Sequence, residues 1–225
     1  STHMDFLICY YRKENRFPSR VFGNVVPDMD DPKGSSTDSF AYLRLPAEAG
    51  DNGVPFQLFP ARPEDLAELL RFYDGASGGL ALDALDLTGE GLADDSLAAE
   101  YERQGFRKER QVFCLRQEGR LGAVMALTIS DLGLNLSSLT NCIHVIVLDQ
   151  ERLRPSTLLS GLHTLLRNYE AEDVPILAYP AGYLDEHAIP YEKKYILWVL
   201  DMDRADEYFR SVRNTFRRNG RDGDA

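Results

Sequence analysis

A strand, a turn and a helix follow one another directly in the run CIHVIVLDQERLRPSTLLSGLHTLL, from Cys142 to Leu166. Its first part, up to Leu148, is rich in β-branched residues, which is typical of a buried strand. Asp149 to Pro155 carries turn residues, and the leucines that follow recur at helical spacing, which predicts a helix with one apolar face. Such a helix buries its apolar face by lying on a sheet. We therefore expect a sheet covered by helices.

Further strands and helices are predicted on both sides of this unit. A short strand is followed by a helix that opens at Arg62-Pro63 and stops at Gly75, because proline favours the first helical turn and glycine ends it. Two apolar runs around the turn Glu118-Gly119 predict a β-hairpin. The remaining predicted elements are a helix at 97–104, strands at 55–59, 140–148, 174–179 and 194–200, and a short helical segment at 182–187.

Breaker-rich stretches divide the chain into four predicted parts. Residues 1–4 are typical of a tag remnant, and 5–53 form an extension with strand-like runs at Phe6–Tyr11 and Ser39–Leu45. Residues 54–202 form the main domain. Residues 203–225 are predicted to form an amphipathic helix and a tail.

Composition excludes several classes of protein. The 225 residues contain 25 Lys and Arg against 36 Asp and Glu, and this net charge of −11 argues against a general nucleic-acid binder or an anionic-membrane binder. No run approaches the roughly 20 apolar residues of a membrane-spanning helix. The three cysteines lack metal-ligand spacing, so we expect no metal and a reduced, cytoplasmic setting.

The element order resembles the Gcn5-related N-acetyltransferase (GNAT) superfamily of acyl-CoA N-acyltransferases over residues 54–202. Three stretches carry the resemblance: Phe56–Leu70, the hairpin Val112–Ile129, and Cys142–Leu166. It implies an α/β (α+β) fold with a mixed, mostly antiparallel sheet flanked by helices. It also implies acetyl-CoA or another acyl-CoA as co-substrate and an amine as acceptor.

The resemblance also implies where the cofactor lies. The family holds the CoA pyrophosphate with a Q/R-x-x-G-x-G/A turn at a helix N-terminus, where oriented N–H groups bind anions. Arg152-Leu-Arg-Pro-Ser-Thr157 is similar, but Pro155 and Thr157 replace the glycines. Direct contacts from arginine to phosphate compensate in one interpretation. In the other, Pro155 and the hydroxyls begin the helix and the arginines are solvated. The implied cofactor-binding residues are Val147, Leu148, Arg152, Arg154, Ser156 and Thr157.

Three residues are candidates for the proton transfers that acyl transfer to an amine requires. The base candidates are Asp149, at the end of the central strand, and His144, on that strand. Tyr183 resembles the family's general-acid tyrosine, with Tyr191 and Tyr195 as alternatives. Each has an equally simple structural interpretation, as a core histidine, a turn aspartate or an edge tyrosine.

Two functions are consistent with these features. One is a GNAT-like N-acyltransferase that moves an acyl group from acyl-CoA to an amine. The other is a non-catalytic GNAT-like module of a larger bacterial protein that binds a ligand or partner. Neighbouring domains or a second copy are the expected macromolecular partners, because the strand-bearing extension can complete the sheet, cover an acceptor cleft or add a strand to a dimer.

Overall fold

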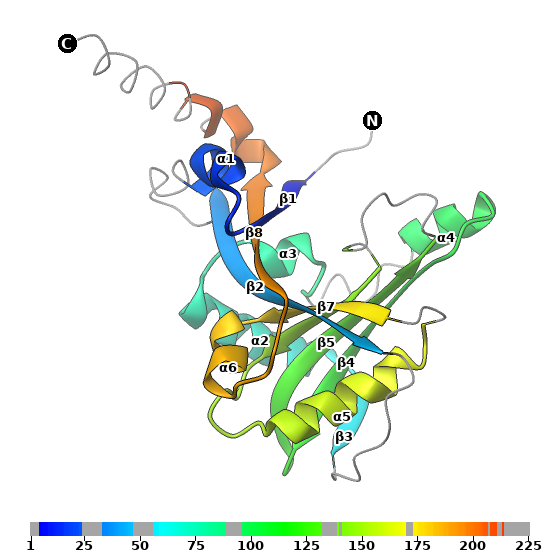
Figure 1. The fold of residues 1–225 in the computed structure, drawn as a ribbon. Helices are drawn as coiled ribbons and strands as arrows, with labels where there is room; N and C mark the ends of the chain where they lie inside the picture. Colours follow the sequence, from blue (N-terminus) through cyan, green and yellow to red (C-terminus); the bar gives the residue numbers. More distant parts are fainter. Residues whose placement is uncertain are drawn as a thin grey trace. The chain divides into compact units, whose positions relative to one another are not determined.

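One mixed sheet organises the protein (Figure 1). The structure, a computed structural model, describes residues 5–23, 33–46, 56–88, 96–131, 139, 141–169, 173–206, 208–210 and 213. The strands are β1 (Phe6–Arg12), β2 (Ser35–Pro46), β3 (Gln57–Pro60), β4 (Lys108–Gln117), β5 (Arg120–Ser130), β6 (Ile143–Val147), β7 (Asp173–Tyr179) and β8 (Lys193–Asp201). The helices are α1 (Arg16–Pro18), α2 (Pro63–Ala76), α3 (Ala81–Ala84), α4 (Ser96–Arg103), α5 (Pro155–Leu166) and α6 (Ala181–Glu186), with η1 (Ser19–Gly23) and η4 (Met202–Arg204) as short π and 3₁₀ segments.

The sheet has the strand order β1-β8-β2-β7-β6-β5-β4-β3 in the described part of the chain. Its pairs with a determined register are antiparallel, except that β6 and β7 run parallel. The crossover between these two strands contains α5, as a parallel connection requires. The predicted fold class, a mixed and mostly antiparallel sheet with helices and a strand-bearing N-terminal extension, is confirmed.

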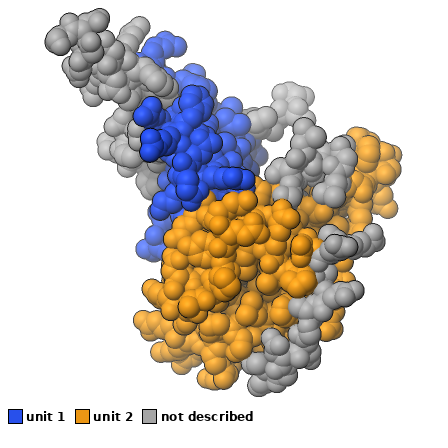
Figure 2. All heavy atoms as spheres, viewed as in Figure 1, with its two compact units in different colours: residues 1–39, 73–86, 195–225 blue, residues 40–72, 87–194 orange. Residues whose placement is uncertain are grey.

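The chain forms two compact units, each drawn from separate stretches of sequence (Figure 2). Unit 1 comprises residues 1–39, 73–86 and 195–225, and unit 2 comprises residues 40–72 and 87–194. In unit 1, a small core gathers Tyr11, Trp198, Leu200 and Tyr208. The domain boundaries expected from the sequence, at 53 and 202, stay predictions.

Unit 2 contains the larger core. Every residue of β6 is buried, because this strand lies between β5 and β7. Helix α5 packs its leucines into the same core, with Leu158, Leu162 and Leu165 nearly inaccessible. A side chain at Gly161 would place its Cβ 2.9 Å from Leu115 Cδ1, so glycine allows α5 to approach β4 closely. The predicted strand, turn and helix at 142–166 therefore form the centre of this unit.

Two predicted segments differ from the structure or lie outside it. The short helix α3 lies between the predicted helices at 62–75 and 97–104, where the sequence predicts no further element. Hydrogen bonds from distant side chains hold its start: Leu80 N–H donates to Ser36 Oγ at 2.8 Å and Ala81 N–H to the Tyr73 hydroxyl at 3.1 Å. Four residues are too few to show helical periodicity. Most of the predicted C-terminal helix and tail, residues 203–225, lies outside the described residues.

Candidate functional site

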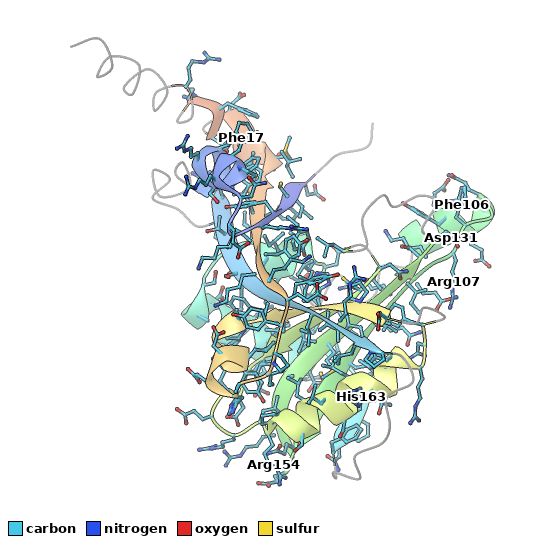
Figure 3. The ribbon with its side chains drawn as sticks, viewed as in Figure 1. Phe17, Phe106, Arg107, Asp131, Arg154 and His163 are labelled. Atoms are coloured by element: carbon cyan, nitrogen blue, oxygen red, sulfur yellow. The ribbon has the colours of Figure 1, made fainter. Side chains whose placement is uncertain are left out.

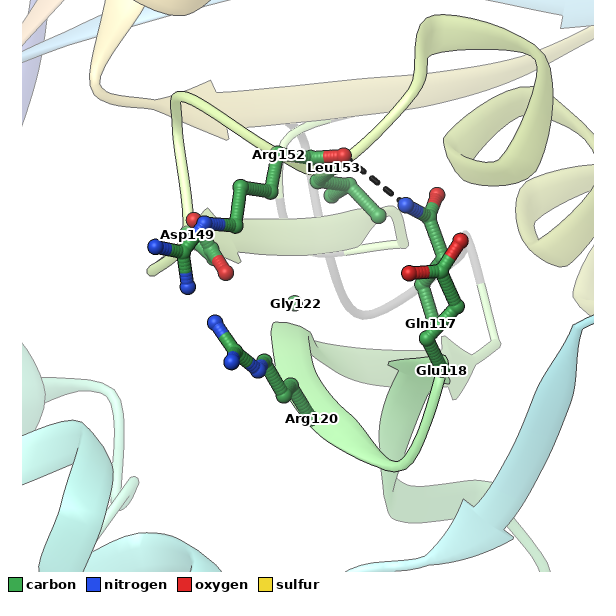
Figure 4. Close-up of a pocket in the computed structure, with 7 residues that line it drawn as sticks. All are labelled: Gln117, Glu118, Arg120, Gly122, Asp149, Arg152 and Leu153. Atoms are coloured by element: carbon green, nitrogen blue, oxygen red, sulfur yellow. Dashed lines mark hydrogen bonds between the residues drawn. The ribbon is translucent and has the colours of Figure 1, made fainter.

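A cavity of about 300 Å³ lies in unit 2 where the β4–β5 hairpin faces the loop from β6 to α5 (Figure 4). Its walls come from two stretches of sequence about 30 residues apart, brought together by the pairing of β5 with β6. The residues that line it are Gln117, Glu118, Arg120, Gly122, Asp149, Arg152 and Leu153.

Gly122 shapes the floor of this cavity. Its carbonyl accepts hydrogen bonds from Leu148 N–H at 2.9 Å and from Asp149 N–H at 3.2 Å, which bends the chain out of β6. A Cβ atom at Gly122 would lie 2.8 Å from Leu153 Cδ1. Glycine therefore permits the loop to fold back against β5.

The loop between β6 and α5 is held by hydrogen bonds that its carbonyl groups accept. Asp149 C=O accepts from Leu153 N–H at 2.9 Å. Arg152 C=O accepts from Gln117 Nε2 at 2.8 Å (Figure 4), and Leu153 C=O accepts from the Tyr183 hydroxyl at 2.7 Å. Because the β4–β5 hairpin, the β6–α5 loop and α6 all take part in these hydrogen bonds, the fold fixes the position of this wall of the cavity.

Arginine is concentrated around this cavity. Arg120 and Arg152 extend from opposite walls toward the Asp149 side (Figure 4). A neighbouring hollow of about 620 Å³ shares Arg120 and Asp149 and adds Arg71 and Arg116. Arg116 forms an ion pair with Asp65 and donates to Gly119 C=O at 3.1 Å. Glu118, Asp149 and Glu68 line the same two spaces, so the arginines supply guanidinium donors for anionic groups without a large net positive charge.

Helix α5 begins directly after Arg154, which Figure 3 labels, and no side chain caps its N-terminus by a hydrogen bond. Arg154, the N-cap residue, donates its N–H to Gln117 Oε1 at 3.1 Å, and Pro155 has no N–H. The amides of Ser156 and Thr157 are thus the first-turn donors that carry the positive end of the helix dipole. Thr157 is fully buried, and its Oγ1 has no hydrogen-bond partner among the described residues.

The structure brings some of the predicted cofactor-binding residues together. Arg152 lines the cavity, and Leu148 lines the neighbouring hollow. Arg154 borders the cavity through Gln117 Oε1, which its Nε also approaches at 3.4 Å. Val147 is buried within β6. The two hydroxyl residues, Ser156 and Thr157, lie in the first turn of α5 and line neither space.

The three predicted catalytic residues occupy different environments. Asp149 lines both the cavity and the hollow. His144 lies in β6 and lines neither space, and its Nδ1 is 3.7 Å from Cys142 Sγ. Burial, with a smaller contribution from Arg110, lowers the pKa of His144 to about 4, so its ring is neutral at pH 7.

Tyr183 lies in α6 and is fully buried. Its hydroxyl proton is directed at Leu153 C=O, and burial raises its pKa. Of the alternative tyrosines, Tyr191 donates to Asp185 Oδ1 at 2.7 Å on the surface, and Tyr195 lies in β8.

Sequence reasoning missed the residues that the hairpin contributes. Gln117, Glu118 and Arg120 lie in the run RQEGR at the β4–β5 turn. Charged residues are ordinary at an exposed turn, so the run carried no specific signal. Only the pairing of β5 with β6 places this turn opposite Asp149 and Arg152.

Comparison with known proteins gives a limited set of matches. No family model matches the chain, and no curated protein matches it. One similar solved structure is a conserved protein of unknown function from Staphylococcus epidermidis, with a TM-score of 0.42 and 10% identity, covering 88% of this chain and 73% of that one.

Two further solved structures are similar at comparable levels. Saccharomyces cerevisiae N-myristoyltransferase with bound myristoyl-CoA has a TM-score of 0.37 and 9% identity, and the match covers 72% of this chain and 50% of that one. A GCN5-related N-acetyltransferase from Kribbella flavida has a TM-score of 0.33 and 13% identity, with 86% and 42% covered. The present chain thus spans half or less of these two proteins.

The described residues contain neither a helix that could span a membrane nor a cluster of metal-ligating side chains. None of the described helices has the length and apolar character needed to cross a membrane. The described residues also contain no group of three or more His, Cys, Asp or Glu side chains placed to hold a metal ion.

Proposed function

We propose that this protein is a GNAT-like N-acyltransferase that moves an acyl group from acyl-CoA to an amine. The observation that carries the proposal is the arginine-lined cavity at the junction of β6 and α5, with Asp149 on its wall. The junction of a central strand and the following helix is also where the family resemblance implies the CoA pyrophosphate.

The cavity fits the phosphates of CoA through side chains more than through the backbone. Pro155 and the bond from Arg154 N–H to Gln117 remove two of the donors that a glycine-rich turn would offer. Arg120 and Arg152 supply guanidinium donors, which match phosphate oxygens in geometry and charge. The uncapped N-terminus of α5, which begins directly after the cavity-lining residue Leu153 and the N-cap Arg154, adds the positive end of its helix dipole nearby.

Acyl-CoA supplies an activated thioester in this reaction. Asp149 is the group that we assign to receive the proton of the attacking amine, because its carboxylate lines both the cavity and the hollow beside it. The negative charge of Asp149 also attracts an ammonium form of the acceptor. Tyr183 keeps the cavity wall in place through Leu153 C=O.

In the first test, the full chain is titrated with CoA, acetyl-CoA and myristoyl-CoA, and binding is measured by calorimetry and by the shift in thermal unfolding. Binding to the native state alone stabilises it by about 2.7 kcal/mol at a ligand concentration 100 times Kd. Replacing Arg152 with alanine should weaken binding by about 10-fold or more, since charge-assisted hydrogen bonds contribute about 1.5–3 kcal/mol. Arg167→Ala, an exposed arginine at the other end of α5, is the matched control and should bind like the wild type.

The second arm follows release of the CoA thiol from acetyl-CoA in the presence of a panel of amines. Asp149→Asn should slow release by about 100-fold or more, the usual contribution of a general base, while it retains CoA affinity. No binding of any CoA species at millimolar concentration would refute the proposal. Binding without amine-dependent release would instead leave a non-catalytic CoA-binding protein.

A further inference from the structure

The backbone groups of the loop before α5 point to two opposite sides. Leu153 N–H donates to Asp149 C=O at 2.9 Å, and Leu153 C=O accepts from the Tyr183 hydroxyl at 2.7 Å. In an extended segment, a residue directs its own N–H and C=O to one side, while the C=O before it and the N–H after it point to the other. On the other side of Leu153 lie Arg152 C=O and Arg154 N–H.

The side-chain amide of Gln117 binds both of these groups. Its Nε2 donates to Arg152 C=O at 2.8 Å (Figure 4), and its Oε1 accepts from Arg154 N–H at 3.1 Å. One amide thus takes the place that a neighbouring strand would have beside Leu153, and Arg154 has the extended backbone angles, φ −73° and ψ 137°, that suit such a pairing. We call these two hydrogen bonds the Gln117 clamp.

The β4–β5 hairpin carries the clamp. Gln117 is the last residue of β4 and pairs with Arg120 of β5 across the turn Glu118-Gly119. Both turn residues have positive φ, 53° and 78°, as in the two-residue turns that match the twist of paired strands. The hairpin therefore ends in a tight turn, and this turn sets where the Gln117 amide meets the loop.

The clamp completes the hydrogen bonding of the loop backbone. Arg154 C=O accepts from Leu158 N–H at 3.1 Å in α5, so each backbone group from Arg152 C=O to Arg154 C=O has a partner. The next residue, Pro155, has no N–H. Both N–H groups of this stretch are already used, and the charged group that it brings to the cavity is the Arg152 side chain (Figure 4).

We infer that Gln117 is a positioning residue for CoA. Its amide holds residues 152–154 extended, and this conformation directs the Arg152 guanidinium into the cavity. Gln117 acts through Arg152 rather than by binding the phosphates itself. The inference rests on the proposed function for the identity of the ligand, whereas the clamp is a property of the chain without ligand.

Water-exchange NMR on the full chain tests the clamp in the absence of CoA. Gln117→Met keeps the length of the side chain and removes both hydrogen-bonding groups. The Arg154 amide should then exchange about 10-fold faster, because it loses a hydrogen bond, whereas the Leu158 amide within α5 should keep its rate. Gln111→Met, at an exposed position of the same strand, is the matched control and should change neither rate.

Gln117→Glu separates the two halves of the clamp. A carboxylate accepts from Arg154 N–H but cannot donate to Arg152 C=O. The Arg154 amide should therefore keep its slow exchange in this variant, unlike in Gln117→Met. If Gln117→Met loses its circular dichroism signal, Gln117→Ala takes its place, because alanine is too short to reach the loop.

A double-mutant cycle tests whether Gln117 acts through Arg152. Gln117→Met alone should weaken CoA binding by about 5-fold or more in calorimetry, since it removes two hydrogen bonds that hold the loop. Added to Arg152→Ala, it should weaken binding by less than about 2-fold further, because the group that it positions is already gone. A merely structural role would add its full loss to that of Arg152→Ala.

The outcomes separate this inference from the proposed function. Equal exchange of the Arg154 amide in wild type and Gln117→Met, or faster exchange at Arg154 and Leu158 alike, would overturn the clamp whether or not CoA binds. Full additivity with Arg152→Ala would overturn the positioning role. A wild type that binds no CoA would refute the acyltransferase function and the role of Gln117 toward CoA, and the exchange rates would still decide whether the clamp exists.

Discussion

Burial decides the chemistry of single residues in this protein. His144 was one of two base candidates from the sequence, and its ring is buried beside Cys142 Sγ with a pKa lowered to about 4. Such a group is a weak base at neutral pH. Asp149, only five residues further along, lines two solvent-accessible spaces. The two candidates differ in environment, which residue type and spacing do not reveal.

The lowered pKa of His144 predicts how stability depends on pH. The unfolded chain binds a proton at His144 below about pH 6.5, whereas the folded chain does so only near pH 4. Stability from this group is therefore full above pH 6.5 and is lost as the pH falls toward 4. His144→Gln should remove that loss, on the order of 3 kcal/mol.

Urea unfolding of wild type and His144→Gln between pH 7.5 and 4.5 measures this dependence. Carboxylates titrate in both proteins, so they cancel in the difference. The difference in unfolding free energy should be constant above pH 6.5 and should shift in favour of the variant below it. If the unfolding free energies of the two proteins changed in parallel over the whole pH range, a buried, neutral His144 would be contradicted.

At the scale of elements, Tyr183 ties α6 to the loop that precedes α5. Its hydroxyl donates to Leu153 C=O in a buried position. Its ring packs edge-on against the ring of His187, with the two ring centroids 4.5 Å apart. Tyr183→Phe leaves that carbonyl without its partner, which should cost about 1–3 kcal/mol of unfolding free energy. It should also weaken CoA binding, because the cavity wall loses one of its supports.

A matched substitution separates this effect from the loss of any tyrosine hydroxyl. Tyr191 donates to Asp185 Oδ1 on the surface, where water can replace it. Tyr191→Phe should therefore cost less than about 0.5 kcal/mol, the usual limit for surface substitutions. Equal losses for the two variants in chemical denaturation would mean that the Leu153 hydrogen bond has no special importance.

Elements with a clear period were predicted correctly from the sequence. The two apolar runs on either side of the turn Glu118-Gly119 predict β4 and β5, and the leucine spacing predicts α2 and α5. Helix α3 was missed because hydrogen bonds from Ser36 and Tyr73 hold its first amides. These partners lie far from α3 in the sequence or belong to another helix, and no local pattern reports them.

At the scale of the whole molecule, stability should fall from the centre of the sheet toward its edges. In unit 2, β6 is buried along its full length, whereas β3 is short and mostly exposed. Local opening requires less free energy where few apolar contacts must break. Amides of β6 and β5 should exchange with deuterium last, and those of β3 first.

Hydrogen-exchange mass spectrometry with peptides covering 57–60, 120–130 and 143–147 measures this order. Rates are compared after correction for the intrinsic exchange of each sequence. Exchange in β3 as slow as in β6 would show that the sheet opens only as one cooperative body.

The sequence by itself determined most of the elements and the fold class, because apolar periodicity and turn residues act over a few positions. Asp149 was predicted from its place at the end of the central strand and Arg152 was implied by the family resemblance; both line the cavity, and their roles stay predictions. The tertiary structure alone decided that Arg120, Gln117 and Gly122 face them, that His144 is neutral, and that the Tyr183 hydroxyl is held by Leu153. Each of these depends on burial or on partners about 30 residues away along the chain, and such contacts exist only once β5, β6 and α6 have packed together.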